Sequence, residues 1–170
     1  HFYASSIFIT NILWRKKLTK KLPKKKNLFV VDLATGTGDV ALHLSQEKNI
    51  QKIQGFDLSK KMVEIGRQKV QNKQVGHKVS LDIGDGMNIP LKDNSVDVIT
   101  LSFGIRNFSN PQKGLDEIQR VLKPGGRALI MEFSIPRNAF IKKAYFFYFR
   151  KVLPWIGNKV SGHKDAYTYL

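Results

Sequence analysis

Short apolar runs alternate with segments of helical periodicity along most of this chain. The runs predict strands at residues 28–31, 52–58, 78–83, 96–101 and 127–133. The helical spacing between them predicts helices at residues 39–47, 60–71 and 111–122. Because strands that alternate with helices form a parallel sheet covered on both faces, the pattern predicts a doubly wound α/β fold.

Two further helical patterns flank this core. Residues Phe2–Leu22 predict an amphipathic helix that ends before Pro23. In the second pattern, residues 138–155, apolar side chains share one face, basic ones lie opposite, and Phe146 and Phe147 fall among the charges. Aromatic side chains on a basic face suit a lid or a surface that touches lipid, and packing against the N-terminal helix is the alternative.

A glycine-rich turn follows the first apolar run, in the stretch LFVVDLATGTGD at residues 28–39. Gly36 and Gly38 let the backbone pass close to a bound ligand without a Cβ in the way. Such a turn after a strand serves dinucleotides, S-adenosylmethionine and plain turns alike, and Ala41 even completes the relaxed dinucleotide fingerprint. The turn therefore predicts a ligand site and leaves the ligand open.

Acidic residues at the ends of the next two strands narrow the choice of ligand. Asp57 is placed where a carboxylate can accept from both hydroxyls of a ribose, and the alternative is a capping contact with the helix that follows Ser59. Asp85 lies between two glycines, where it can meet an adenine amino group. Ser102, Phe103 and Gly104 follow the fourth strand and form the next part of the rim. Together these strand ends favour a cofactor that lacks phosphates, S-adenosylmethionine, over a dinucleotide.

Charge and composition limit the partners. The 170 residues fit one domain, and 29 basic against 13 acidic residues give a net charge of +16. That charge favours anionic partners such as nucleic acid or an anionic membrane face, and a solvated lysine-rich surface is the alternative. The chain has no cysteine, so no disulfide or thiolate metal site is expected and a cytoplasmic location is favoured. No metal is predicted. No apolar run approaches the ~20 residues of a membrane span, and the missing initial methionine indicates a fragment.

Three segments together resemble the class I S-adenosylmethionine methyltransferases, and more narrowly the ubiquinone/menaquinone biosynthesis C-methyltransferases. The family's first motif is similar to VVDLATGTGDVAL, its fourth-strand rim to LSFGIRNFSNP and its signature to RVLKPGGRALIMEFS. Segments near the end, PWIGNKVSG and AYTYL, also resemble the family. The resemblance implies a Rossmann-like sheet and transfer of a methyl group from S-adenosylmethionine to the ring of a reduced polyprenylated quinone, demethylmenaquinol or a methoxy-polyprenyl-benzoquinol.

The resemblance also implies a set of site residues by position. The implied cofactor contacts lie in the glycine-rich turn and at the strand ends: Asp32, Gly36, Thr37, Gly38, Asp57, Asp85, Gly86 and Ser102. For catalysis, Arg106 is expected to stabilise a phenolate of the ring and Asn107 to orient it, with anchoring of the loop as the alternative for Arg106. His163 and Tyr167 are the next candidates for proton handling or ring contact, although the family usually carries an acid where His163 stands.

The predicted organisation is one methyltransferase domain over residues 1–170. It divides into an N-terminal helix with a basic connector (1–26), a cofactor-binding core (27–134) and a substrate-side helix and tail (135–170). The resembled class completes a seven-stranded sheet with an antiparallel hairpin, which this chain lacks, so at least five parallel strands are expected. The fifth strand is then an exposed edge unless a partner covers it.

The implied substrate has an apolar polyprenyl tail, and residues 139–152 combine aromatic and basic side chains. Together these features predict peripheral contact with the inner face of an anionic membrane. A homodimer is left open. A nucleic-acid methyltransferase is the main alternative because of the charge, but NPQK at residues 110–113 lacks the aromatic that would stack on a flipped base, so a nucleic-acid partner is disfavoured. A binding module without catalysis is the third interpretation.

Overall fold

A parallel sheet runs through the residues that the computed structural model describes, which are 14, 15 and 17–132. They belong to one unit, His1–Glu132. The strands are β1 (Leu28–Leu33), β2 (Ile50–Asp57), β3 (Val79–Ile83), β4 (Val96–Ser102) and β5 (Leu122–Met131), in the spatial order β3-β2-β1-β4-β5. The helices are α2 (Asp39–Leu44), α3 (Lys60–Asn72) and α4 (Pro111–Val121), with a 3-10 turn, η1, at Ile105–Asn107.

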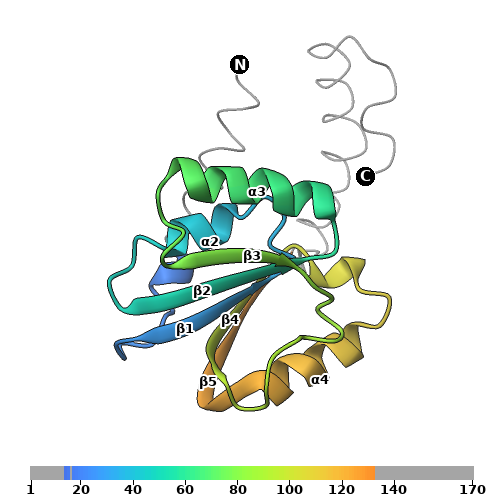
Figure 1. Ribbon diagram of the computed structural model, residues 1–170. Coiled ribbons are helices and arrows are strands. Elements are labelled where there is room, and N and C mark those ends of the chain that lie inside the picture. The colour runs from blue at the N-terminus through green and yellow to red at the C-terminus, as the bar shows by residue number, and fades with distance from the viewer. Residues whose placement is uncertain (1–13, 16, 133–170) are drawn as a thin grey trace, which may run out of the picture. The chain divides into compact units, whose positions relative to one another are not determined.

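Both faces of the sheet are covered (Figure 1). Along β1, Leu28 and Val30 pack with α2 and α3 in one apolar cluster, whereas Val31 and Leu33 pack with α4 in another. The central strand β4 is buried from Val96 to Leu101. A parallel strand buried on both faces needs a nearly continuous apolar run, which is the pattern that predicted it. The predicted doubly wound α/β fold is therefore confirmed.

The order of the strands creates a switch point between β1 and β4. The chain moves outward from β1 to β2 and β3, and then crosses to the other side of β1 to form β4 and β5. The loops that leave the carboxyl ends of β1 and β4 consequently turn toward opposite faces of the sheet. A crevice outside the strands at this point is where open α/β sheets bind ligands.

Local signals account for the bounds of the helices. Ser59 Oγ accepts from Met62 N at 3.4 Å to begin α3, and Asn110 Oδ1 accepts from Lys113 N at 3.1 Å to begin α4. The helix α2 ends at Leu44 rather than Glu47. Ser45 lies at that end, where its hydroxyl donates to Leu42 O at 2.8 Å.

The prediction for the start of the fifth strand was wrong. Residues Lys123–Gly126 were expected to end the preceding helix, with a strand from Arg127, but α4 ends at Val121 and β5 begins at Leu122. Leu122 pairs with Val96 and Arg127 with Val98, so the four residues between them form a bulge in the strand. Gly125 allows the bulge because its φ is 78°. The expected end of this strand, Phe133, lies outside the described residues.

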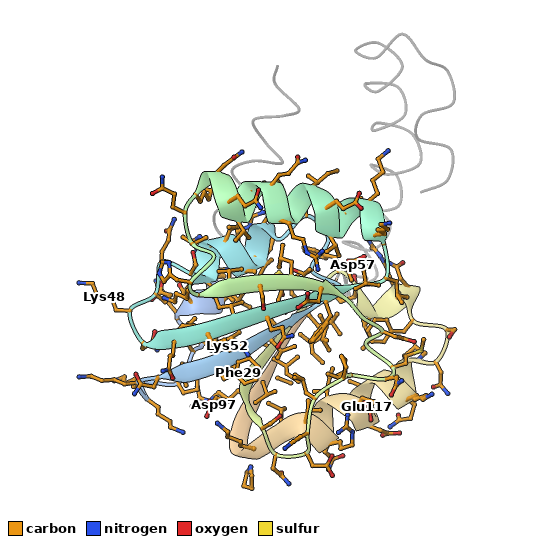
Figure 2. The ribbon with its side chains drawn as sticks, in the orientation of Figure 1. Phe29, Lys48, Lys52, Asp57, Asp97 and Glu117 are labelled. Carbon is orange, nitrogen blue, oxygen red and sulfur yellow. The ribbon has the colours of Figure 1, made fainter. Side chains whose placement is uncertain are left out.

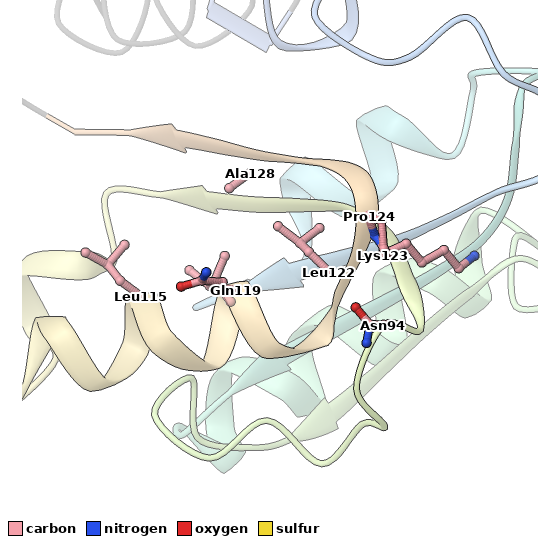
Figure 3. A pocket seen from close by; sticks show the side chains of 8 residues that line it. Asn94, Leu115, Gln119, Leu122, Lys123, Pro124 and Ala128 are labelled. Carbon is pink, nitrogen blue, oxygen red and sulfur yellow. The ribbon is translucent and has the colours of Figure 1, made fainter.

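The strand β5 forms one outer edge of the sheet within the described residues, as expected, and β3 forms the other. The side chains of β5 are more exposed than those of β4, and Ile130 is 42% exposed. A hollow of about 430 Å³ lies between α4 and this strand (Figure 3), lined by Leu115, Gln119, Leu122 and Ala128 among others. Across residues 14, 15 and 17–132, no helix is both long and apolar enough to cross a membrane.

Part of the predicted N-terminal helix is described. Residues 14, 15 and 17–19 are helical, and Leu18 and Leu22 are buried in the cluster beneath α2. The Trp14 ring meets the Phe103 ring edge to face, with centroids 5.6 Å apart. Residues 2–13 of this helix and the whole predicted helix 138–155 lie outside the described residues.

Candidate functional site

A cleft of about 140 Å³ lies at the carboxyl ends of the strands, at the switch point. Four loops contribute to it: those that follow β1, β2, β3 and β4. The lining residues are Ala34, Asp57, Leu58, Gly84, Gly86, Gly104, Asn107 and Phe108. The convergence of segments that are far apart in sequence makes this cleft the candidate site.

The loop after β1 is a tight turn in which two positions, 36 and 38, favour glycine. Gly36 has φ 56° and Gly38 has φ 75°, which is the left-handed region that glycine enters without strain. A Cβ at Gly38 would lie 2.7 Å from Leu81 Cδ1, so the turn also packs closely on β3. Ala34, which lines the cleft, itself has φ 50°.

Asp57 connects this loop to the start of α3. Its Oδ2 accepts from Gly36 N at 2.8 Å, and its Oδ1 accepts from Ser59 N at 2.9 Å. The contact with Ser59 is the helix-end contact considered as an alternative, and the contact with Gly36 adds a link to the glycine-rich turn. Each carboxylate oxygen has two lone pairs, so Asp57, which lines the cleft, keeps acceptor sites that its contacts with Gly36 and Ser59 do not use. Figure 2 shows Asp57 at the end of the sheet opposite to Asp97.

Asp32 lies beneath the loop and does not line the cleft. It is 1% exposed, and its carboxylate accepts from Thr35 Oγ1 and from Thr100 Oγ1, each at 2.6 Å. Burial raises the pKa of Asp32 to about 6, against the two hydroxyl hydrogen bonds, which lower it. Asp32 therefore fastens the loop after β1 to the neighbouring strand β4.

Asp85 and Gly86 form the wall that follows β3. The Asp85 Oδ1 accepts from Met87 N at 2.8 Å, which closes a turn around Gly86. Gly86 is buried and lines the cleft, while the Asp85 side chain is half-buried beside it. The structure thus brings Gly86 to the same cleft as Asp57, whereas Asp85 is the next residue in sequence and is not part of the lining.

The predicted residues after β4 are divided between the cleft and its margin. Asn107 lines the cleft. Ser102 Oγ is buried and has no hydrogen-bond partner among the described residues. Arg106 is 55% exposed, and its Nη1 lies 3.6 Å from Glu132 Oε1. Burying the Ser102 hydroxyl without a hydrogen bond costs free energy of folding, and a polar group of a ligand at the end of β4 would remove that cost.

Thr37 is placed on the α3 side of the loop. Its hydroxyl accepts from Lys69 Nζ at 2.7 Å and donates to Asp39 Oδ2 at 3.3 Å. Thr37 is absent from the lining of the cleft, and its hydroxyl is engaged by Lys69 and Asp39 instead. The two remaining predicted residues, His163 and Tyr167, lie outside the described residues.

The prediction from sequence missed several residues that shape this site. Thr35 and Thr100 hold Asp32, while Phe108 lines the cleft beside Gly104, which the sequence had placed at the rim. Thr100 was detectable in principle, since it is the one polar side chain in the run VITL of a central strand. Phe108 carried no such signal, because a single aromatic residue in a loop is uninformative by itself.

The residues present fit a nucleoside cofactor with a polar tail. The loops after β1 and β4 approach so closely that a Cβ at Gly104 would lie 2.5 Å from Ala34 Cβ. The turn leaves room for a ligand, because a Cβ at Gly36 would meet nothing within 4 Å. With the carboxylate at the end of β2 and a buried hydroxyl at the end of β4 that has no partner among the described residues, these features fit a Rossmann-like fold of the methyltransferase class.

Comparisons with known proteins identify the family within this class. A sequence profile described as the ubiE/COQ5 methyltransferase family matches residues 6–170. The chain is 45% identical to the ubiquinone/menaquinone biosynthesis C-methyltransferase UbiE of Geotalea daltonii, over 92% of this chain and 67% of that protein. It is 36% identical to the demethylmenaquinone methyltransferase of Porphyromonas gingivalis, over 93% and 65%. The chain thus spans about two thirds of the length of these curated relatives.

The fold agrees with that assignment. The structure of an S-adenosylmethionine-dependent methyltransferase from Aquifex aeolicus matches with a TM-score of 0.65 and 28% identity, over 74% of this chain and 66% of that chain. The chain belongs to the ubiE/COQ5 methyltransferase family. The predicted family, the enzyme class and the cofactor S-adenosylmethionine are therefore confirmed.

Proposed function

We propose that this chain methylates a ring carbon of a reduced polyprenylated quinone, demethylmenaquinol or a methoxy-polyprenyl-benzoquinol. The relatives named above are C-methyltransferases of ubiquinone and menaquinone biosynthesis. The observation that carries the proposal is the joining of Asp57, Gly86 and Asn107 in one cleft within a chain that matches this family.

S-adenosylmethionine supplies an electrophilic methyl group on a positively charged sulfur, and transfer of that group leaves a neutral thioether. In our proposal, the free lone pairs of Asp57 accept from the two ribose hydroxyls, while Asp85 and the backbone of Gly86 face the adenine. The buried hydroxyl of Ser102 bonds to the polar tail of the cofactor. Because Gly36 and Gly38 have no Cβ, the cofactor can lie close to the backbone of the turn.

The acceptor carbon must be electron-rich to attack the methyl group. A hydroxyl next to it has a pKa of ~10 and ionises at neutral pH only with help. Arg106, half-exposed at the rim, is the proposed source of that help, with Asn107 orienting the ring. In the proposed step the hydroxyl proton passes to a base as the phenolate forms, and the ring carbon then bonds to the methyl group as the methyl–sulfur bond breaks. The ring carbon afterwards loses its own proton as the hydroxyl is restored, so that one proton is released in all. His163 and Tyr167 are the sequence-based candidates for that base.

The test uses the full-length protein with methyl-labelled S-adenosylmethionine. Label should enter a demethylated quinol with a short prenyl tail and should be absent from bulk RNA. Label in RNA alone would indicate a nucleic-acid enzyme. Cofactor binding without transfer to any acceptor would indicate a binding module. Either result overturns the proposal.

A substitution tests the proposed action of Arg106. Because lysine presents a point charge in place of a planar fork, Arg106→Lys should lower kcat by about tenfold or more and leave the Kd for S-adenosylmethionine nearly unchanged. Arg127→Lys is the matched control, since Arg127 contacts Lys21 O, at 2.9 Å, away from the cleft. Normal turnover of Arg106→Lys would leave only the loop-anchoring explanation.

The proposal includes peripheral contact with the inner face of an anionic membrane, where a polyprenylated substrate resides. It rests on the net charge of +16 and on the lysines and aromatics of residues 139–152, which lie outside the described residues. Replacing Phe146 and Phe147 by serine should reduce association with anionic liposomes. Unaltered binding would contradict this part of the proposal. A homodimer is compatible with it and is tested by sedimentation.

A further inference from the structure

The Phe108 ring fills a slot between two glycines from separate elements. Gly86 lies in the loop after β3, and Gly114 lies in α4. A Cβ added at either glycine would overlap the ring: the three atoms nearest to a Cβ at Gly86 all belong to Phe108, as do the two nearest at Gly114. Both glycines are buried, and Phe108 is half-buried. The ring is thus in close contact with the backbone on both sides.

The loop after β3, which carries Gly86, is also hydrogen-bonded to the segment that carries Phe108. The Met87 Sδ accepts from Ser109 Oγ and from Asn110 N, both at 3.4 Å. On the side of the 3-10 turn, Phe108 N donates to Ile105 O at 3.2 Å. The loop after β3 is therefore joined to the residues that follow η1, and the Phe108 ring forms the apolar part of that junction.

This junction forms part of the candidate site. Phe108 and Gly86 both line the cleft, together with Asp57 at the end of β2. A ring that touched only core side chains would add stability and nothing else. Because the Phe108 ring packs on Gly86 in the wall of the cleft, it also fixes the position of that wall.

We propose that Phe108 is a positioning residue that sets the place of Gly86, and with it the adenine-side wall of the cofactor cleft. The inference rests on the proposed assignment of adenine to Asp85 and Gly86. It implies that residues 86 and 108 are matched in size, because the space that a side chain at 86 would need is the space that the ring occupies. Gly86 is then a glycine because residue 108 is large.

The matched sizes predict a rescue. The φ of Gly86 is not in the left-handed region, so its backbone φ does not exclude alanine, and the three atoms nearest to the added Cβ all belong to the ring. Gly86→Ala should weaken binding of S-adenosylmethionine by about tenfold or more. Phe108→Val should weaken it by about fivefold, because the wall loses its support. The double variant should bind at least about threefold more tightly than Gly86→Ala alone, which is a non-additive result for two residues in contact.

The measurements are the Kd for S-adenosylmethionine and for S-adenosylhomocysteine by calorimetry, the Tm, and kcat at saturating cofactor, all with the full-length protein. Both Kd values should shift together, because the two ligands share the adenosine. At saturation kcat should stay within about twofold, since the reacting end is not altered. Ile118→Val is the control: Ile118 is 4% exposed in the core beside α4 and does not line the cleft, so it should lower the Tm without changing either Kd.

Two results would overturn the inference. In one, all the variants at 86 and 108 lower the Tm but bind both ligands like the wild type, as Ile118→Val does. In the other, the effects of Gly86→Ala and Phe108→Val on Kd simply multiply in the double variant. A wild-type protein that fails to methylate a quinol would instead refute the proposed function, while its binding of the cofactor still allows the size match to be judged.

Discussion

Asp32 shows how one buried carboxyl group can link the stability of the fold to pH. Its ordinary pKa of 3.8 is raised to about 6, chiefly by burial. The folded chain therefore keeps the proton on Asp32 to a higher pH than the unfolded chain does. Between those two values the folded state binds more protons, so this residue makes the free energy of unfolding fall as the pH rises.

The first prediction follows from this fall in the free energy of unfolding with rising pH. Asp32→Asn removes the titration while an amide can still bond to both threonine hydroxyls, so the loss of stability from pH 5 to pH 7.5 should shrink by about 1 kcal/mol. Urea unfolding, followed by tryptophan fluorescence at the two pH values, measures the difference. Asp116→Asn, on the exposed face of α4, is the matched control and should keep the wild-type slope. An unchanged slope in Asp32→Asn would contradict the raised pKa.

Thr100 illustrates what the sequence leaves unspecified at the scale of single residues. The glycine-rich turn and the acids at the strand ends could be found because each has a local signature. The partner of Asp32 depends instead on the register in which β1 lies beside β4, which places Thr100 directly opposite Asp32. Register across sequence-distant parallel strands is a property of the packed sheet, so Thr100 could be noticed as a polar residue in a buried run, but its pairing with Asp32 could not be assigned beforehand.

At the scale of elements, the strands were predictable and their irregularities were not. Apolar runs identified every strand of the described sheet, because burial on both faces imposes that pattern. The bulge at Lys123–Gly126 was interpreted as the end of a helix, since proline and glycine usually end one. What keeps these residues in the strand is a contact distant in sequence: Lys123 Nζ lies 2.9 Å from Asp97 Oδ2, and the buried Asp97 also accepts from Phe29 N at 3.0 Å.

The two glycines of this bulge should respond differently to substitution. A Cβ at Gly126 would lie 2.9 Å from Lys123 O and 3.1 Å from Asp97 O, which are backbone atoms that cannot move aside cheaply. Gly126→Ala should therefore cost about 1–3 kcal/mol of unfolding free energy. Gly125, with φ 78° and open space around it, should accept asparagine at a cost of about 0.5–1 kcal/mol. Denaturant titration of both variants compares them, and equal losses would contradict the steric explanation.

Arg120 holds the loop between β3 and β4 against α4. Its guanidinium donates to the carbonyls of Ile89 and Leu91, each at 2.9 Å, and to the carboxylates of Asp93 and Glu117. Glu117 in turn accepts from Ile89 N at 2.8 Å. Hydrogen bonds from the guanidinium hold the pKa of Glu117 below its usual range, along with the bond from Ile89 N, although burial opposes them.

Lysine cannot reproduce this fork of donors, so Arg120→Lys should cost about 2–3 kcal/mol and loosen the loop. The measurement is amide hydrogen exchange of Ile89, which should become faster by about tenfold or more. Arg67→Lys is the matched control at the edge of β3, where the guanidinium contacts Leu81 O and the exposed Asp82. An Ile89 amide that exchanges as slowly in Arg120→Lys as in the wild type would show that the loop is held by its apolar contacts instead.

At the scale of the whole molecule, the cleft joins loops that leave four strands of one sheet. A ligand that bridges these loops binds only the folded arrangement, because the unfolded chain does not bring them together. Binding should therefore stabilise the entire sheet by RT ln(1 + [L]/Kd), or about 2.7 kcal/mol when the ligand is at a hundred times its Kd. For a chain of this size, that corresponds to a rise in Tm of about 5–10 °C.

This linkage separates the two cofactors that the glycine-rich turn alone could not distinguish. S-adenosylmethionine should raise the Tm by that amount, whereas NAD at the same concentration should leave it unchanged. The rim offers Asp85 in the loop after β3 and, at the end of β4, a hydroxyl with no partner in the part of the chain that the structure describes, but a pyrophosphate would need the backbone donors of a helix N-terminus, and α2 has only six residues. Asp85→Asn should reduce the shift given by S-adenosylmethionine, and Asp116→Asn should preserve it. A shift with NAD as large as that with S-adenosylmethionine would contradict the assignment of the cleft, since nothing else in the described rim selects against a dinucleotide.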